Sequence, residues 1–562
     1  MIALIIGAAI VTPSSLQAQE ADTLQPQTCA VTGNLRDSQG QPVAAVEVTL
    51  ADRDGAALLS VESQPDGRYL LPWPADQAVP SNLELQYERP HFENATLPLS
   101  ETQREELSGC QAVAVPIVEL ERQITPAFWI AAVVFAIVLA FIAMGTLHNT
   151  LAALLGASIL FAFSYLGPLV DEGLFIFEFE RSLEFVDWNV IFLIMGMMIV
   201  IAVIERTGIF QWSALQAYKL SGGRRWLLVI ILMVITGVAS AFLDNVTTML
   251  LMTPITIQIA LSLGMNPLAL LMPEVMASNV IGISTLVGTP TNILIGSFAE
   301  ISFSDFLINL TPGVVLAMVG LVLYHEYIYR KELRGSQEES GISNVLLARL
   351  QERGQIEEPE DLRKAGIVGA GMIILFVIGE QFHLLPSVTA IMGATALMVW
   401  IRPDIDEMIE SVDWTTLVFF IALFICVGGV QEVGLISFIA AWIGDLVGEN
   451  LVLAMLAVTW LSAFLSTVIA NIPFTAAMLP VVGFLSGNIP GADNKVLFYC
   501  LSVGSAMGGN GSLIGASANM VTAGIADRAG TPITYVYFLK KGLPALIITV
   551  ALAMIWLFIR FL

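Results

Sequence analysis

One carboxylate stands inside an otherwise apolar stretch of the sequence. Asp244 interrupts residues 226–263, which are too many for one membrane span and suit a re-entrant hairpin. Ionisable residues in such surroundings are expensive and usually functional. Burial favours the protonated form of a carboxyl group, whereas a bound cation favours the ionised form. Asp244 is therefore predicted to exchange a proton for a metal ion. The alternative is a structural carboxylate that caps a helix.

Polar breaks in apolar segments accompany this carboxylate. They lie at residues 244–248, 288–292, 471–475 and 508–519. Unpaired backbone groups are costly in hydrocarbon, so a helix break at membrane depth persists only where it lines a cavity or contacts a ligand. Free helix ends offer N–H groups to anions and carbonyl oxygens to cations. The breaks are therefore expected to meet and form one binding site.

The residues predicted to bind the ion or substrate are Asp244, Asn245, Thr247, Thr248, Glu274, Asn279, Gly288, Thr289, Thr291, Asn292, Asn471, Thr475, Asn510, Ser512, Ser517 and Asn519. Of these, Asp244, Asn245 and Asn292 are the expected sodium ligands. For Glu274 a functional role and a helix-packing role stay open. Asp187 and Asp413 each precede a Trp at the start of a span and are predicted helix N-caps.

Composition sets the solvent in which these residues work. Of 562 residues, 56% are hydrophobic and only 13% are charged, which excludes an ordinary water-soluble globule. The net charge of −24 excludes nucleic acid as a partner, because phosphates need a basic face. Nothing resembles a catalytic nucleophile, a metal cage or a phosphate loop. We therefore expect no enzymatic activity and no cofactor beyond sodium or a proton as coupling ion.

Apolar runs of about 20 residues predict spanning helices after Pro126. The predicted spans are 127–146, 150–167, 188–204 and 311–329, with a hairpin at 226–263 and a broken helix at 268–301. A charged soluble linker at 330–364 separates this first repeat, 127–329, from a second one at 365–562.

The second repeat copies the spacing of the first. Asn245 and Pro254 stand nine positions apart, as do Asn471 and Pro480. The loop at 205–225 holds four basic residues, whereas its counterpart at 431–450 holds none. Because cytoplasmic loops collect Lys and Arg, the two copies should face opposite sides of the membrane.

The predicted fold is thus a membrane all-α protein of two inverted repeats. Each repeat has about five spanning helices, a re-entrant hairpin and a broken helix. The linker is expected inside the cell. The N-terminal domain and the C-terminus are expected on the extracytoplasmic side of the cytoplasmic membrane.

A soluble domain is predicted ahead of the membrane region. Residues 1–18 have the pattern of a signal peptide. Residues 21–124 show short alternating strands separated by turn residues, which predict an extracytoplasmic β-sandwich. Cys29 and Cys110 bracket this domain and are expected to form a disulfide. About 50 of its residues resemble the carboxypeptidase-regulatory-like sandwich family.

Residues 240–257 (SAFLDNVTTMLLMTPITI) and 186–210 carry a wider resemblance. Over 127–562 the chain is similar to the ion transporter (citrate transporter-like) superfamily, most closely to the branch of the P protein, the arsenite pumps and the NhaD-type sodium/proton antiporters. The resemblance implies a homodimer whose mobile part moves like an elevator against a scaffold. It also implies binding sites at the two hairpin tips and the two helix breaks.

Three functions follow as hypotheses. Sodium/proton antiport is the first hypothesis, because negative charge at Asp244 would repel a carboxylate substrate. The dicarboxylate branch typically carries Ser-Asn-Thr at both tips, and this chain does not. Transport of a small anion, such as a dicarboxylate, citrate, arsenite or chloride, is the alternative. A membrane-anchored binding or sensor protein is the third, but an anchor needs no repeated polar breaks.

Overall fold

The computed structural model describes residues 29–562 except 39, 53–55, 75–77, 81, 223, 335–355 and 357. The predicted signal peptide lies outside the described residues, and so does most of the predicted linker. Contacts divide the chain into two units, Met1–Thr125 and Pro126–Leu562. Each unit is described by itself.

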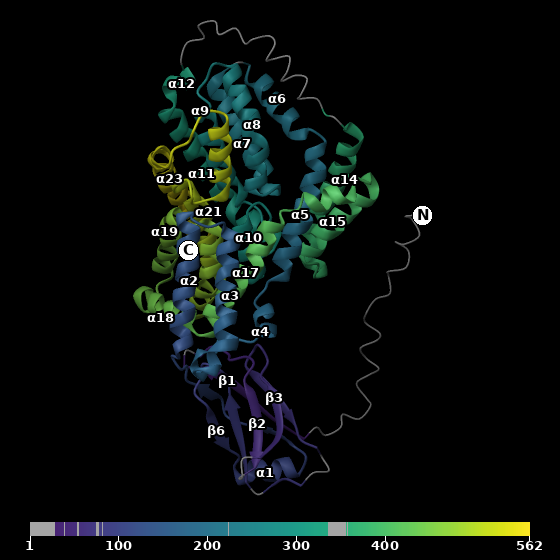
Figure 1. Ribbon diagram of the computed structural model, residues 1–562, viewed down its shortest axis with the longest axis vertical. Helices are drawn as coiled ribbons and strands as arrows, with labels where there is room; N and C mark the ends of the chain where they lie inside the picture. Colours follow the sequence, from purple (N-terminus) through teal and green to yellow (C-terminus); the bar gives the residue numbers. More distant parts are fainter. Residues whose placement is uncertain are drawn as a thin grey trace. The chain divides into compact units, whose positions relative to one another are not determined.

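The first unit contains two small β-sheets (Figure 1). One sheet comprises β1 (Ala30–Asp37), β4 (Arg68–Pro72), β7 (Ala112–Ala114) and β8 (Val118–Leu120), and the other β2 (Glu47–Asp52), β3 (Ala57–Glu62), β5 (Leu83–Glu88) and β6 (Ala95–Pro98); the helix α1 (Glu101–Ser108) follows β6. Leu35 and Leu71 from the first sheet share one buried core with Leu50 and Leu85 from the second. The unit is therefore a β-sandwich.

Two covalent or polar links stabilise this sandwich. Cys29 and Cys110 form the predicted disulfide, which closes a loop of 81 residues. The hydroxyls of Tyr69 and Tyr87 share a hydrogen bond of 2.8 Å inside the core. Burial raises the pKa of both Tyr hydroxyls.

The regular secondary structure in the described part of the second unit is helical, and ten of its helices are long and apolar enough to cross a membrane. Its first half contains α2 (Pro126–Met144), α3 (Asn149–Leu166), α4 (Phe179–Glu184), α5 (Trp188–Arg206), α6 (Ile209–Ser221), α7 (Arg225–Phe242), α8 (Asn245–Ser262), α9 (Leu268–Gly282), α10 (Pro290–Phe298) and α11 (Phe303–Ile328). Its second half contains α12 (Arg330–Arg334), α14 (Pro359–Ile378), α15 (Pro386–Ile401), α16 (Ile405–Glu410), α17 (Trp414–Glu432), α18 (Leu435–Val447), α19 (Leu451–Val468), α20 (Asn471–Asn488), α21 (Val496–Gly508), α22 (Ser517–Arg528) and α23 (Tyr535–Phe561). Short 3-10 turns join some of them.

Helix lengths recur between the halves. α5 and α17 each have 19 residues, α6 and α18 each have 13, and α7, α8, α19 and α20 each have 18. Asp187 caps α5 and Asp413 caps α17, as predicted, through side chains that accept backbone N–H groups. The same order of helices thus occurs twice along the chain.

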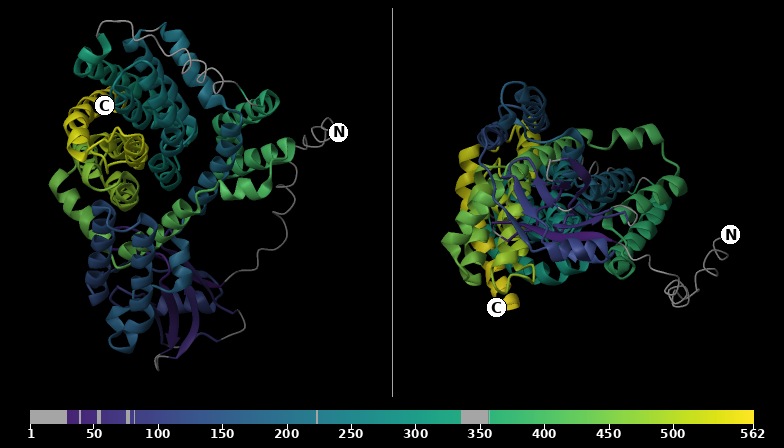
Figure 2. Two further views of the ribbon diagram at one scale, coloured as in Figure 1. Left: turned by 45° about the horizontal axis from the view of Figure 1, so that its top comes forward. Right: turned by 90° about the horizontal axis from the view of Figure 1, so that it is seen from below.

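The helices pack in two sets. The hairpin group comprises α7 to α11 and α19 to α23, in which α7 packs on α9, α19 on α21 and α11 on α23. The flanking group comprises α2, α3, α5, α14, α15 and α17, in which α5 packs on α15 and α3 on α17. α14 and α15 lie on the side of the bundle away from α23 (Figures 1 and 2). α10 and α20 make contacts between the two groups.

Four sequence-based boundaries were wrong. The loops expected at 205–225 and 431–450 contain α6 and α18, each entered through a glycine with a positive φ, which resets the chain direction. α11 begins at Phe303 rather than 311, because the polar residues of its first turns lowered the apolar signal. α14 begins at Pro359, inside the expected linker, where two acidic residues suit a helix N-terminus.

Candidate ion-binding site

All four predicted breaks interrupt helices. The turns between α7 and α8 and between α19 and α20 form two hairpins. The helices α9 and α10 are separated at residues 283–289, and α21 and α22 at residues 509–516. Each hairpin packs against the broken helix of its own repeat, and α8 also packs on α22. The helix ends therefore lie together inside the hairpin group.

Asp244 caps the helix that follows it. Its Oδ1 accepts the N–H groups of Val246 (2.8 Å) and Thr247 (2.9 Å), and its Oδ2 accepts the Thr247 hydroxyl at 2.5 Å. The side chain is half-buried. The structural alternative is thus realised in this conformation. A carboxylate has about four lone-pair positions, so capping leaves room for a cation.

Four buried asparagines meet at the centre of the breaks. Asn279 on α9 accepts the Asn245 amide at 2.8 Å and donates its own amide to Asn510 (2.9 Å) and Asn519 (3.1 Å). Their side chains are at most 4% exposed. These residues come from the first hairpin tip and from both broken helices. We call them the asparagine network.

Asn292 is bound in a different way. Its amide nitrogen donates to the carbonyl oxygens of Ile283 (2.9 Å) and Thr285 (2.8 Å), and so closes the break between α9 and α10. Its side-chain oxygen accepts the Ser502 hydroxyl of α21 at 2.6 Å. Within the described part of the chain, no hydrogen bond joins Asn292 to Asp244 or Asn245. The three expected sodium ligands therefore do not form one cluster in this conformation.

The two breaks are closed by matching contacts. Ser240 donates to the Ser278 carbonyl oxygen (3.1 Å), and in the second repeat Ser466 donates to that of Ser505 (2.6 Å). Both bonds join a hairpin arm to the broken helix beside it. The repeats thus agree in contact as well as in spacing.

One glycine in each break allows the backbone to lie close to the neighbouring hairpin. A Cβ added to Gly288 would lie 2.3 Å from the Gly282 carbonyl oxygen and 2.7 Å from that of Ser240. A Cβ on Gly515 would lie 2.9 Å from the carbonyl oxygens of Gly509 and Ser466. Only glycine fits these positions without backbone movement.

Glu274 lies deeper in the same bundle. It is 0% exposed, and its Oε1 accepts the Thr236 hydroxyl of α7 at 2.6 Å. It is one turn before Ser278 and Asn279 on α9. The carboxyl is therefore directed into the protein interior, between a hairpin arm and the broken helix.

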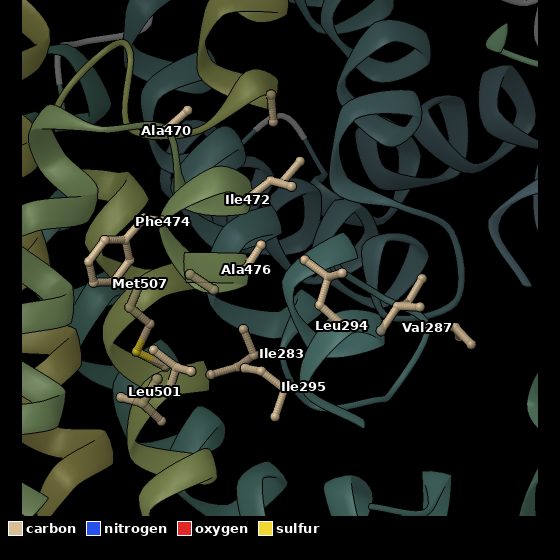
Figure 3. Close-up of a cluster of buried hydrophobic side chains, with 14 of the residues drawn as sticks. Ile283, Val287, Leu294, Ile295, Ala470, Ile472, Phe474, Ala476, Leu501 and Met507 are labelled. Carbon is tan, nitrogen blue, oxygen red and sulfur yellow. The ribbon is translucent and has the colours of Figure 1, made fainter. Parts of the chain in front are cut away.

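The second hairpin tip carries no acidic residue. Ala470 precedes α20 and supplies no side-chain cap, and the Asn471 backbone N–H donates to Gly515 at 3.2 Å. Apolar residues dominate around this tip: Figure 3 shows Ile472 and Ala476 of α20 in one cluster with Leu294 of α10.

The remaining predicted residues make local contacts. The hydroxyl groups of Thr248 and Thr475 each donate to a backbone carbonyl one turn earlier. Thr289 caps α10 and bonds to the Thr291 hydroxyl at 3.0 Å. Ser512 donates to the Thr467 carbonyl oxygen (2.5 Å), and Ser517 begins α22 without a side-chain hydrogen bond among the described residues.

Sequence reasoning missed Ser502, Thr236 and Thr256. These residues lie within apolar helices, where a single hydroxyl gives no pattern. Aligning the two repeats would have pointed only to the hydroxyl residues of the breaks, because Thr285 and Ser512 occupy equivalent positions in the two repeats. The hydroxyl partners of Asn292 and Glu274 come from other helices and become visible only in three dimensions.

The arrangement supplies carboxylate, amide and hydroxyl oxygens around converging helix ends. Oxygen donors of this kind suit a hard cation such as sodium. The helices α8, α10, α20 and α22 each begin at one of the four breaks, and their N-termini present positive dipole ends that suit an anion. The geometry therefore fits the binding of a small ion.

Comparisons with known proteins agree on the class. A family model described as a citrate transporter matches residues 134–494. A 46 kDa membrane protein of Mycobacterium leprae is 36% identical over 434 residues, which cover 77% of this chain and 99% of that one. An uncharacterized transporter of Synechocystis is 32% identical, covering 75% of this chain and 96% of that one.

Two further likenesses are more distant or partial. The human P protein is 31% identical over 531 residues, which cover 80% of this chain and 62% of that protein. The crystal structure of the YdaH transporter of Alcanivorax borkumensis shares 13% identity at a TM-score of 0.46, covering 65% of this chain and 84% of that one. A structural similarity at that level supports no conclusion about the fold of this chain.

Proposed function

The chain belongs to the citrate transporter family, and on that premise we propose that it is an ion-coupled secondary transporter that exchanges sodium for protons across the cytoplasmic membrane. The observation that carries the proposal is the buried asparagine network beside Asp244, which joins the first hairpin tip to both broken helices. Interrupted backbone at membrane depth is tolerated where an ion is held. A carboxylate at that place can bind either a proton or a cation.

The mechanism we propose is an elevator. The hairpin group would carry the ion, and the flanking group would stay in place as a scaffold. A cavity of about 440 Å³ supports this division, because it lies between residues of α5 and the turn before α15 on one side and residues of α10 and α11 on the other. Asn189, Glu300 and Glu380 are among its lining residues.

We further propose that the two repeats are inverted and that the protein works as a homodimer. The recurrence of helix lengths supports the repeat, and the opposite charge of the segments 205–225 and 431–450 supports its inversion. In this arrangement the β-sandwich and the C-terminus are extracytoplasmic and the linker is cytoplasmic.

Transport of a small anion is the second candidate. The four helix N-termini at the site favour it, and the N-termini of α20 and α22 carry no side-chain caps. Citrate, another dicarboxylate, arsenite and chloride are the anions to test. Uptake of one of them without sodium-linked proton movement would decide for this candidate.

The test is sodium-driven proton flux in proteoliposomes that contain the full-length protein. Asn is as good an N-cap as Asp, so Asp244→Asn keeps the cap and removes the charge. We expect this variant to fold and to lose sodium-driven proton flux.

Asp187→Asn is the matched control. Asp187 also accepts two backbone N–H groups at a helix start, but it lies outside the site. Flux that survives Asp244→Asn unchanged would remove Asp244 from the mechanism. An inactive Asp187→Asn would show that the substitution disturbs capping in general.

A further inference from the structure

The carboxyl group of Glu274 has unusual surroundings. Its Oε1 accepts the Thr236 hydroxyl, but its Oε2 has no hydrogen-bond partner among the described residues. The Thr256 hydroxyl of α8 lies close enough to interact with the carboxyl without meeting hydrogen-bond geometry, and it has no other partner there. Both side chains are 0% exposed. Two unpaired polar groups therefore lie together in the protein interior.

No positive side chain balances this carboxyl group. Within the described part of the chain, no Lys, Arg or His nitrogen lies within 4.0 Å of it. The helices that pack against α9, together with the cap of α8, carry these charged or titratable residues: Arg225, Asp244, Asp305, Tyr324, His325, Glu326, Tyr327, Tyr499, Cys500, Asp527, Arg528, Tyr535, Tyr537, Lys540, Lys541 and Arg560. All the acidic and basic residues among them lie within about two turns of a helix end.

An isolated ionised carboxylate in such a place is very unfavourable, so the group neutralises itself by binding a proton or a cation. A proton on Oε2 makes that atom a donor, and the Thr256 oxygen is an acceptor with free lone pairs. One proton thus satisfies both unpaired groups at once.

We propose that Glu274 is a proton-binding site distinct from Asp244, that its protonated Oε2 donates to Thr256, and that this proton is the one exchanged during transport. The last part rests on the proposed function. Asp244 at the hairpin tip would then hold the cation while Glu274 holds the proton. Glu274 is one helical turn before Ser278, which bonds the hairpin arm through Ser240. Loss of the proton can therefore act on the contact between hairpin and broken helix.

The second repeat shows what the position looks like without this function. Leu501 replaces Glu274, and Val482 replaces Thr256. Leu501 lies in an apolar cluster with Met507 and Ile283 (Figure 3). The packing of a broken helix on its hairpin therefore does not require a carboxyl group here, which speaks against a purely structural role for Glu274.

Infrared difference spectroscopy tests the proton site directly. A protonated carboxyl group absorbs apart from a carboxylate, so acidification of the full-length protein in liposomes should give a protonated-carboxyl band that Glu274→Gln removes. Gln keeps both contacts, because its oxygen accepts from Thr236 and its amide donates to Thr256. Thr256→Val should shift the band, since the proton loses its acceptor. Glu432→Gln should leave the band unchanged, because Glu432 pairs with Arg181 and belongs to α17, outside the hairpin group.

Transport assays test the coupling. We expect Glu274→Gln to retain sodium/sodium exchange and to lose sodium-driven proton flux together with its pH dependence. If neither the infrared band nor proton flux responds to Glu274→Gln, the inference is overturned and the proposed function stands. If the wild-type protein moves no protons but shows the Glu274-dependent band, the proposed function fails while the proton site remains. If Glu274→Gln does not fold, the Thr256→Val variant tests the inference, because its infrared band should be shifted.

Discussion

The two halves of the site share a backbone and differ in side chains. In the first repeat Asp244 and Thr289 cap the helices that follow the hairpin tip and the break. In the second repeat Ala470 and Ala516 occupy the capping positions, and neither supplies a side-chain hydrogen bond. The polar residues Glu274 and Asn279 of the first broken helix correspond to Leu501 and Ala506.

This difference separates what the fold requires from what the ion requires. Glycines and hydroxyls that close the breaks recur in both repeats, so they belong to the architecture. Gly288 and Gly515 are such a pair. Carboxylates and the central amide occur once, so the architecture does not need them. We infer that the first half-site handles the cation and the proton, and that the second supplies mainly helix ends.

The largest effect should come from the asparagine network. Asn279→Ala removes three hydrogen bonds and leaves three buried amide groups short of a partner. At about 1 kcal/mol or more for each orphaned group, we expect a loss of stability of about 3 kcal/mol and loss of transport. The thermal midpoint of the purified protein in detergent measures the first part, and a liposome assay the second.

Asn488→Ala is the control for that experiment. Asn488 is exposed at the end of α20 and donates only to a backbone carbonyl of its own helix. Its replacement should change neither the midpoint nor transport. An Asn279→Ala protein as stable as the control would mean that the network contributes little to joining the repeats.

Substitution of the glycine pair should have the next largest effect on stability, and it should show which of the two breaks packs more tightly against its hairpin. Gly288→Ala places a Cβ closer to backbone than Gly515→Ala does, at 2.3 Å against 2.9 Å. We expect both to destabilise, Gly288→Ala by about 2 kcal/mol and Gly515→Ala by about 1 kcal/mol. Gly524→Ala, with open space around it on α22, should instead gain up to about 1 kcal/mol. Equal losses at both breaks would contradict the tighter approach in the first repeat.

The sequence predicted these breaks because polar residues inside long apolar runs leave few explanations. It also predicted the caps at Asp187 and Asp413, whose type and position are local signals. It could not predict that Asn279 joins residues from three other segments, since an amide in a helix gives no hint of its partner. The choice between capping and ion binding at Asp244 depended on rotamer and neighbours, which composition does not determine.

The smallest effects should come from exchanging the capping residues. Asp244→Ala leaves the N–H groups of Val246 and Thr247 without their acceptor, and we expect a loss of about 1 kcal/mol. Ala470→Ser should gain only a few tenths, about 0.3 kcal/mol, because Pro473 at the third helical position has no N–H to be capped. Thermal midpoints of the two variants measure the difference. Suppose that Ala470→Ser raised the stability as much as Asp244→Ala lowered it. The second hairpin tip would then be able to use a cap that it lacks, and the two tips would differ only in ion binding.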